Sequence, residues 1–141
     1  MVVTGLGVVA SNGIGVPAFW KANCEGLSGV STIQAFDITD HDTKIAGEVR
    51  DFEGAAFLGP TTAKHMDRFG QFALVAAREA LGDAGIKESP EVLEKAGIFM
   101  GSGLGGMFFY ERQLEVVRTA GLRRAHPGSV PRITPNAPAG E

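Results

Sequence analysis

The chain has 141 residues, 44% of them hydrophobic, and a formal net charge of −3, which is an ordinary composition for a globular protein. The slight acidic excess argues against nucleic acid as a partner, because nucleic-acid-binding domains are usually basic. No apolar run approaches the roughly 20 residues that cross a bilayer, and no secretory signal is visible. The single cysteine excludes an internal disulfide and a metal site of several cysteines. We therefore expect a cytoplasmic chain that forms one compact domain without membrane contact or metal.

A strand and a helix are predicted at the beginning of the chain. Residues 2–10 form an apolar run that is closed by the turn residues Ser-Asn-Gly, a pattern typical of a strand. Pro17 suits the first turn of a helix, where its missing amide costs nothing, and Gly26 marks a stop. We therefore expect a helix over residues 16–26.

The strongest helix signal lies in the middle of the chain. Residues 27–43 have no sustained period and indicate a surface excursion, whereas residues 44–49 alternate weakly and predict a short strand. Between residues 61 and 85, apolar side chains recur at steps of three and four and predict one long amphipathic helix. The members of this apolar stripe are Met66, Phe69, Ala73, Ala76 and Ala80.

Strand and helix alternate again in the last third of the chain. Residues 96–103 are apolar and predict a buried strand, and residues 105–121 predict a second amphipathic helix that ends at Gly121. Residues 122–141 carry four of the seven prolines and predict irregular backbone. Strands that alternate with helices are typical of a parallel α/β architecture.

The glycines of the first strand do not have the spacing of a nicotinamide-binding turn. A Rossmann turn needs Gly-x-Gly-x-x-Gly, but five residues separate Gly5-x-Gly7 from Gly13-x-Gly15. The short-chain dehydrogenase pattern has three residues between Thr-Gly and Gly-x-Gly, whereas seven residues separate Thr4-Gly5 from Gly13-x-Gly15 here. The run over residues 101–106 matches the Rossmann letters, but no acidic residue follows about 20 positions later. Both patterns therefore speak against a dinucleotide cofactor.

The remaining reactive side chains have simple structural explanations. Cys24 lies inside a predicted helix with no strand before it, so we expect a small side chain packed on the core. His41, His65 and His126 lack the spacing of metal ligands. The acids of "DITDHD" lack the glycine turn and distal glutamate of a calcium loop, and we expect them to be solvated.

Several motifs follow one another along the chain: "VVTGLGVVASNGIG" followed by "FW", then "GLSGVSTIQAFD", "KIAGEV", "KHMDRF", "GIFMGSGLGG" and "NAPAG". Taken in this order, they resemble the N-terminal portion of a β-ketoacyl-acyl carrier protein synthase, most closely the elongating synthase II class of bacterial fatty-acid synthesis. The resemblance covers essentially the whole chain. It implies an α/β protein with the thiolase-like, layered α-β-α-β-α fold, of which residues 1–141 are an incomplete part, and a homodimer.

The resemblance also implies a reaction, decarboxylative Claisen condensation. In the family, a cysteine at a strand-to-helix elbow takes the acyl chain from acyl carrier protein, and two histidines assist decarboxylation of the malonyl thioester and stabilise the oxyanion. That cysteine follows the "NAPAG"-like segment in a Thr-Ala-Cys context, after the position of Glu141, and the histidines come later still. We therefore expect no catalytic residue within the 141 residues, no cofactor, and no activity of this chain by itself.

Three groups of binding residues follow from the resemblance. The "GSGLGG" segment resembles the turn that lines the acyl pocket, which implies that Gly103, Leu104 and Gly105 lie beside the bound chain. Lys64 and Arg68 resemble a docking edge that steers the acidic carrier protein. The segment "SVPRITPNAPAG" resembles one near the dimer interface and the partner's tunnel. The residues expected there are Gly128, Ser129, Val130, Pro131 and Asn136.

Alternatives remain open at this point. Relatives usually carry an aromatic pair at the positions of Gly128 and Ser129, so the preferred acyl length is open. The same motifs suit a polyketide ketosynthase or a non-catalytic partner of the chain-length-factor type, which replaces the elbow cysteine; an NAD(P)-dependent dehydrogenase is a distant alternative. A layered fold cut short would expose apolar edges, so we expect the isolated chain to be poorly soluble or partly unfolded.

Overall fold

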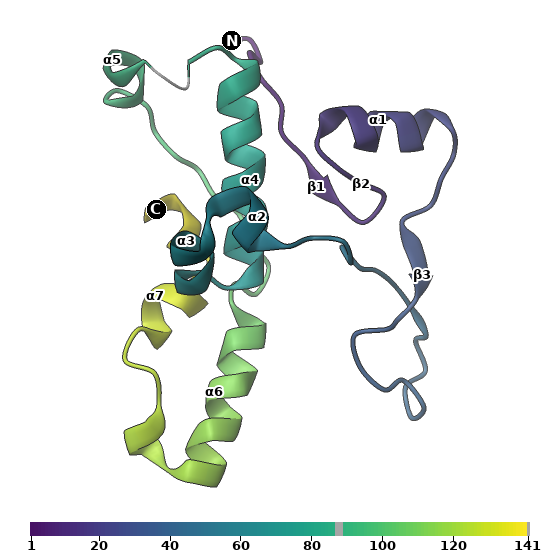
Figure 1. Cartoon of the computed structure of the whole chain (residues 1–141), viewed down its shortest axis with the longest axis vertical. Coiled ribbons are helices and arrows are strands. Elements are labelled where there is room, and N and C mark those ends of the chain that lie inside the picture. Colours follow the sequence, from purple (N-terminus) through teal and green to yellow (C-terminus); the bar gives the residue numbers. More distant parts are fainter. Residues whose placement is uncertain (87–88, 141) are drawn as a thin grey trace. The chain divides into compact units, whose positions relative to one another are not determined.

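The computed structural model describes residues 1–86 and 89–140, and the chain divides into two compact units. Few apolar side chains are buried within the described residues: Ala22 and Phe52 in the first unit, and Leu58 and Ala63 in the second. Helix α4 (Arg68–Asp83) contributes residues to both units (Figure 1). The first unit contains Met1–Phe52 and Val75–Glu88, and the second contains Glu53–Leu74 and Ser89–Glu141.

The first unit contains a tight antiparallel hairpin followed by a helix. Strand β1 (Val9–Ala10) pairs with β2 (Gly13–Ile14), so the strand predicted over residues 2–10 is shortened to two residues. Helix α1 (Val16–Cys24) packs on β2 and has a proline in its first turn, as predicted (Figure 1). Trp20 of this helix is 66% exposed.

Residues 5–8 bond to a helix in place of a neighbouring strand. The amide of Leu6 donates to Asp83 Oδ2 at 3.0 Å, and the amide of Val8 donates to Glu79 Oε2 at 2.9 Å. Glu79 Oε1 also accepts the amide of Val16 at 2.8 Å. The two amides match the two carboxylates in spacing, because two residues of extended chain and four residues of helix both advance about 6–7 Å. Two carboxylates of α4 therefore take over the acceptor role of a strand.

Gly5 and Gly7 allow this extended segment to approach the helix backbone directly. A Cβ at Gly7 would lie 1.8 Å from the carbonyl oxygen of Ala76, and a Cβ at Gly5 would lie 2.1 Å from that of Ala80. Both alanines belong to the predicted apolar stripe and are half-buried. These glycines therefore serve close packing of backbone on backbone, which agrees with the interpretation that they are not a cofactor-binding turn.

A second hairpin completes the first unit. Strand β3 (Val30–Thr32) pairs antiparallel with β4 (Ile45–Gly47), which confirms a short strand within residues 44–49. β3 was not predicted, because all three of its residues are exposed and the strand therefore has no alternation of apolar and polar side chains. Both strand pairs in the described part of the chain are antiparallel, so the parallel pairing predicted from alternating elements is not observed there.

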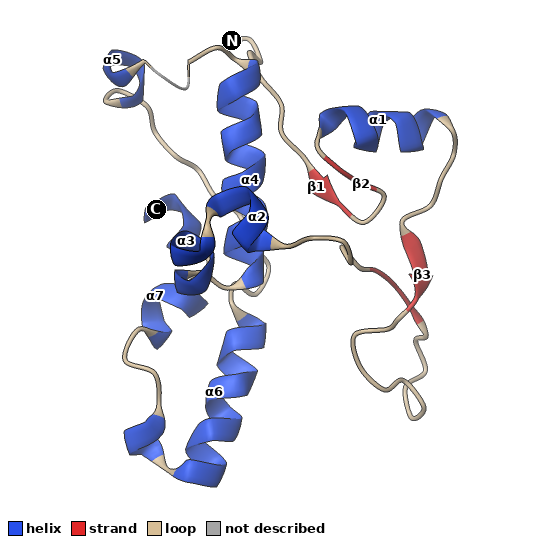
Figure 2. Cartoon of the chain, viewed as in Figure 1, coloured by secondary structure: helices blue, strands red, loops and turns tan. Residues whose placement is uncertain are grey.

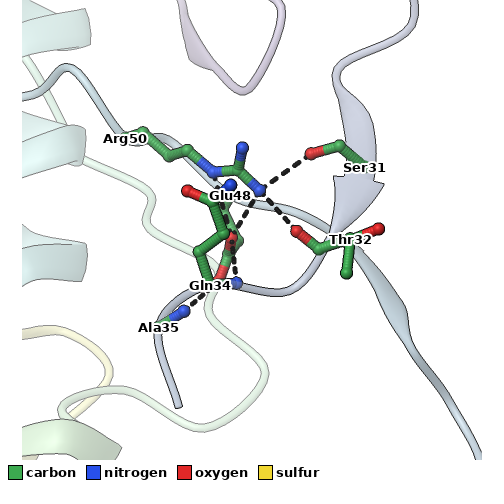
Figure 3. Close-up of polar contacts among 6 residues, drawn as sticks. All are labelled: Ser31, Thr32, Gln34, Ala35, Glu48 and Arg50. Carbon is green, nitrogen blue, oxygen red and sulfur yellow. Dashed lines mark hydrogen bonds and ion pairs between the residues drawn. The ribbon is translucent and has the colours of Figure 1, made fainter. Parts of the chain in front are cut away.

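Glu48 and Arg50 follow β4 and form a clamp, the Glu48–Arg50 pair, across the hairpin (Figure 3). Arg50 Nη2 lies 2.8 Å from Glu48 Oε2. The same nitrogen donates to Ser31 Oγ at 2.8 Å and to the Thr32 carbonyl oxygen at 2.6 Å. One guanidinium therefore bridges the two strands of the hairpin.

The carboxylate of this clamp also holds the loop after β3. Glu48 accepts the amides of Gln34 and Ala35, each at 3.0 Å (Figure 3). The hydrogen bond from Arg50, followed by that from the Gln34 amide, holds the pKa of Glu48 below its usual value. The charged form of Glu48 is therefore the form that binds the loop.

The second unit begins with short helices, α2 (Gly54–Leu58) and α3 (Pro60–His65), which pack on each other. The single helix predicted over residues 61–85 is wrong, because the chain turns extended at Met66 (φ −115°, ψ 148°) between α3 and α4. Asp67 then starts α4: its carboxylate accepts the amide of Arg68 at 2.5 Å, and aspartate is favoured before a helix. The apolar spacing runs across this break and conceals it.

The rest of the second unit is helix and loop (Figure 2). Helix α6 (Met107–Ala120) ends at Gly121, as predicted. The strand predicted over residues 96–103 is wrong, because this stretch has no strand partner among the described residues and leaves Phe99 99% exposed.

Residues 122–140 are more regular than predicted. The remaining helices are α5 (Pro90–Leu93), η1 (Leu122–Arg124), α7 (Ser129–Ile133) and η2 (Ala137–Gly140). Within residues 1–86 and 89–140, no helix has the length and apolarity to cross a bilayer.

Gly7→Ala should destabilise the chain, because the new methyl group would lie 1.8 Å from the Ala76 carbonyl oxygen. Overpacking of this kind costs about 1–3 kcal/mol. Gly82→Ala is the matched control: it adds the same methyl group to α4 where nothing lies within 4 Å, and it should stabilise the helix by about 1 kcal/mol. Urea unfolding followed by circular dichroism measures both changes. An unchanged midpoint for Gly7→Ala would contradict the packing.

The amide of Gln34 should lose its protection against hydrogen exchange in acid. Because the pKa of Glu48 is lowered in the folded chain, its contribution to stability is present above the unfolded pKa of about 4.3 and is lost as the pH falls through the folded value. Glu48→Gln removes the charge at every pH. The ratio of Gln34 exchange rates, variant over parent, should therefore be large near pH 6 and approach one once the pH has fallen below the lowered pKa of Glu48 in the folded chain. A ratio that is constant with pH would refute this assignment.

Candidate functional site

Three of the motifs singled out from the sequence come together in the second unit, and the first is the turn over residues 101–106. Ser102 Oγ accepts the amide of Gly105 at 2.9 Å, and Gly105 has a φ of 66°, a conformation that favours glycine. Leu104 is 73% exposed. The turn therefore presents Leu104 outward on a backbone that is held by its own hydrogen bonds.

The turn contacts the segment that contains α7, the second motif. The amide of Gly106 donates to the carbonyl oxygen of Ile133 at 2.9 Å. A Cβ at Gly105 would lie 2.3 Å from that oxygen, and a Cβ at Gly106 would lie 2.3 Å from the carbonyl oxygen of Arg132. A Cβ at Gly103 would meet no described atom within 4 Å. The close contact of the turn with the α7 segment is therefore made at Gly105 and Gly106.

The residues expected near a dimer interface lie in and around α7. The amide of Gly128 donates to His126 Nδ1 at 3.0 Å, and Ser129 Oγ donates to the His126 carbonyl oxygen at 2.5 Å. Gly128 and Ser129 therefore form a tight turn that is held by His126. Val130 is 71% exposed, and Asn136 is exposed between α7 and η2.

Pro131 borders a small cavity together with Asp67 and Pro138. Its volume is about 10 Å³, which is room for about one water molecule. An acyl chain does not fit in this cavity.

The third motif, "KHMDRF", places its two cations differently. Lys64 lies exposed in the last turn of α3. Arg68 begins α4, is half-buried, and holds its guanidinium carbon 5.1 Å from the centre of the Phe72 ring. Such a cation–π contact orients the guanidinium. Lys64 is therefore the more accessible cation of the predicted docking edge.

Asp67 links this motif to the turn, and the sequence analysis missed it. Its side chain is buried, with 9% exposed, and its Oδ2 accepts the amide of Phe109 at 3.1 Å. A Cβ at Gly106 would lie 2.9 Å from the same oxygen. The available signal was an aspartate directly before a helical run, but the assumption of one continuous helix hid it.

Cys24, His41 and Asp37 do not belong to the three motifs described above. Cys24 is exposed in α1, so the prediction of core packing is wrong; Ala22, on another side of the helix, is the buried residue, with 6% exposed. His41 is exposed, as expected, with its ring edge-on to Phe36 at 5.4 Å. The acid Asp37 is exposed, and its carboxylate bonds the amide of Thr39 at 3.0 Å. Among the described residues, no cluster of three or more His, Cys, Asp or Glu side chains suits a metal ion.

Comparison with known sequences gives this arrangement a family. A family profile described as "Beta-ketoacyl synthase, N-terminal domain" matches residues 1–141. The 3-oxoacyl-[acyl-carrier-protein] synthase 2 of Coxiella burnetii is 38% identical over 99% of this chain, and that of Vibrio harveyi is 36% identical over 99%. The chain spans 34% of the length of each of these relatives.

Solved structures agree with the sequence comparison. The ishigamide ketosynthase/chain length factor has a TM-score of 0.78 and 31% identity, covering 97% of this chain and 34% of that one. A ketosynthase in a type II polyketide synthase complex with its acyl-carrier protein has a TM-score of 0.75 and 23% identity, covering 99% of this chain and 37% of that one. The predicted thiolase-like fold is thereby confirmed. The chain belongs to the β-ketoacyl synthase family and matches its N-terminal domain.

Proposed function

We propose that this chain is the N-terminal, incomplete part of a 3-oxoacyl-acyl carrier protein synthase of fatty-acid elongation. The whole enzyme condenses a malonyl-carrier with an acyl thioester and releases carbon dioxide. The observation that carries the proposal is the 38% identity with a synthase 2 along essentially the whole chain. The nucleophilic cysteine and both histidines come from other residues of the enzyme, so the 141 residues alone are inactive.

In this proposal, the turn over residues 101–106 forms one wall of the acyl pocket, with Leu104 facing the chain. The 73% exposure of Leu104 supports it, because an apolar side chain on a firmly held turn is suited to contact an apolar ligand. Gly103 and Gly105 flank it without side chains. Other segments of the enzyme complete the pocket.

The accessible cation of α3 serves the carrier protein in this proposal. Acyl carrier protein is acidic, and a lysine at the rim of a docking surface steers an acidic partner electrostatically. Lys64 is exposed and Arg68 is half-buried on the Phe72 ring, so Lys64 contributes more to the encounter and Arg68 more to the local structure.

The proposed enzyme is a cytoplasmic homodimer, and residues 128–136 lie near the dimer interface and the partner's tunnel. The exposure of Val130, 71%, supports this placement. Large apolar side chains elsewhere are exposed too, such as Val2 at 83%, Ile98 at 69% and Phe99 at 99%. Exposed apolar surface of this kind favours association, so the isolated chain is poorly soluble or partly unfolded.

A second candidate is a non-catalytic partner of the chain-length-factor type, or a polyketide ketosynthase. The similarity to the ishigamide ketosynthase/chain length factor favours it. The residue at the elbow cysteine position distinguishes the two: a Thr-Ala-Cys sequence supports the condensing enzyme, and another residue there supports the non-catalytic partner. Sequencing the coding template past the codon for Glu141 decides.

The activity is tested by grafting residues 1–141 onto the Coxiella burnetii synthase 2 in place of the matching segment. The folded chimera should elongate an acyl-carrier when malonyl-carrier is supplied, because both parts then contribute to one condensing site. The control is the same synthase with its own matching segment deleted and nothing put in its place. A chimera that is folded by circular dichroism but makes no more product than the control would contradict the proposed function.

Lys64→Glu in the chimera should lower kcat/KM for an acyl-carrier about tenfold at low salt, since a rim charge acts on association. The loss should shrink with added salt, because exposed charges are screened beyond about 10 Å at 0.1 M. Lys95→Glu, a second exposed lysine of the same unit, is the matched control. Equal losses for the two variants would argue against a docking role of Lys64.

A further inference from the structure

We propose that Asp67 is a positioning residue whose carboxylate fixes the turn over residues 101–106 against the segment over residues 129–135. It thereby determines where Leu104 lies. The positioning is argued from contacts within the second unit. Its consequence, control of the acyl length that the enzyme accepts, rests on the proposed function.

One carboxylate serves the starts of two helices. Asp67 Oδ1 accepts the amide of Arg68, the first residue of α4, at 2.5 Å, and Oδ2 accepts the amide of Phe109, the third residue of α6, at 3.1 Å. Amides in the first turn of a helix have no acceptor within the helix, and negative charge is favoured there. Gly106 precedes α6 and makes no side-chain cap of its own. Asp67 supplies that cap from a distant part of the sequence.

Phe109, whose amide donates to Asp67, also contacts Arg132 of α7 and His126, which precedes α7. The guanidinium carbon of Arg132 lies 5.0 Å from the centre of the Phe109 ring, and the His126 ring meets the same ring edge-on at 5.8 Å. The amide of Gly106 bonds the carbonyl oxygen of Ile133 at 2.9 Å. Phe109 and Gly106 therefore connect the Asp67 carboxylate and the turn to the α7 segment.

Among the described residues, Leu104 is held mainly through the backbone of its own turn. Its side chain is 73% exposed, so its location depends on the backbone of the turn. That backbone is fastened by the amide of Gly105 on Ser102 and by the amide of Gly106 on Ile133. The second bond lies beside the Asp67 carboxylate, because a Cβ at Gly106 would lie 2.9 Å from Asp67 Oδ2. Loss of the carboxylate should loosen the turn at its α6 end.

Hydrogen exchange in the chimera tests the positioning without relying on activity. In Asp67→Ala, the amides of Gly106 and Phe109 should exchange about tenfold faster, the effect of losing one hydrogen bond to a charged acceptor. Asp67→Asn keeps one acceptor oxygen and should show a smaller increase. Glu111→Ala removes an exposed acid from the same helix and should change neither amide. Unchanged exchange of both amides in Asp67→Ala would overturn the inference.

The consequence is tested by the ratio of kcat/KM for octanoyl-carrier and tetradecanoyl-carrier. Asp67→Ala should change this ratio about tenfold. Asp67→Asn should bring the ratio most of the way back to that of the parent chimera. Leu104→Phe shows how the ratio changes when the pocket is narrowed. Equal losses at both lengths would mean that Asp67 has only a structural role and would overturn the link to acyl length. A folded but inactive parent chimera would refute the proposed function instead, while the exchange data would still decide the positioning. If Asp67→Ala does not fold, Asp67→Asn is compared with Glu111→Gln.

Discussion

The first unit depends on a carboxylate that replaces a strand. Glu79 accepts the amide of Val8 and the amide of Val16, and so ties the extended segment before the first hairpin to the beginning of α1. A hydrogen bond to a charged group contributes about 1.5–3 kcal/mol, and an amide buried without a partner costs a similar amount. With few buried apolar side chains in the described residues, these polar contacts have a large share in fixing the unit. The glycines opposite α4 are a consequence, because only glycine lets the segment come close enough.

The second unit uses the same device at a different place. Asp67 satisfies amides at the start of two helices, as Glu79 satisfies amides on either side of a hairpin. In both cases an acid from one part of the sequence completes the backbone hydrogen bonding of another part. Glu79 and Asp67 thus connect separate parts of the chain by accepting backbone amides. The turn that carries Leu104 and the segment that carries Val130 meet because the backbone at Gly106 is fastened in this way.

The elements that could be predicted from the sequence are those with local signals. Helices α1 and α6 were predicted because a proline, a terminal glycine and a regular apolar period lie within the elements themselves. The strands over residues 2–10 and 96–103 were not predicted correctly, because an apolar run becomes a strand only beside a partner, and the first run bonds to α4 instead. The family motifs indicated the turn and the α7 segment, but no local pattern shows that the carboxylate of Asp67 fastens them, since the hydrogen bond that it accepts from the Phe109 amide spans 42 residues of sequence.

Helix α1 exposes both Trp20 and Cys24, and each is the single residue of its kind in the chain. Four residues apart on a helix, the two side chains lie on the same face about 6 Å apart along the axis. A label on the thiol that quenches only on contact therefore lies next to the indole while α1 is helical, and its contact with the indole changes when the helix unfolds. The first unit thus contains its own optical reporter, which follows the folding of α1 without the introduction of any foreign residue.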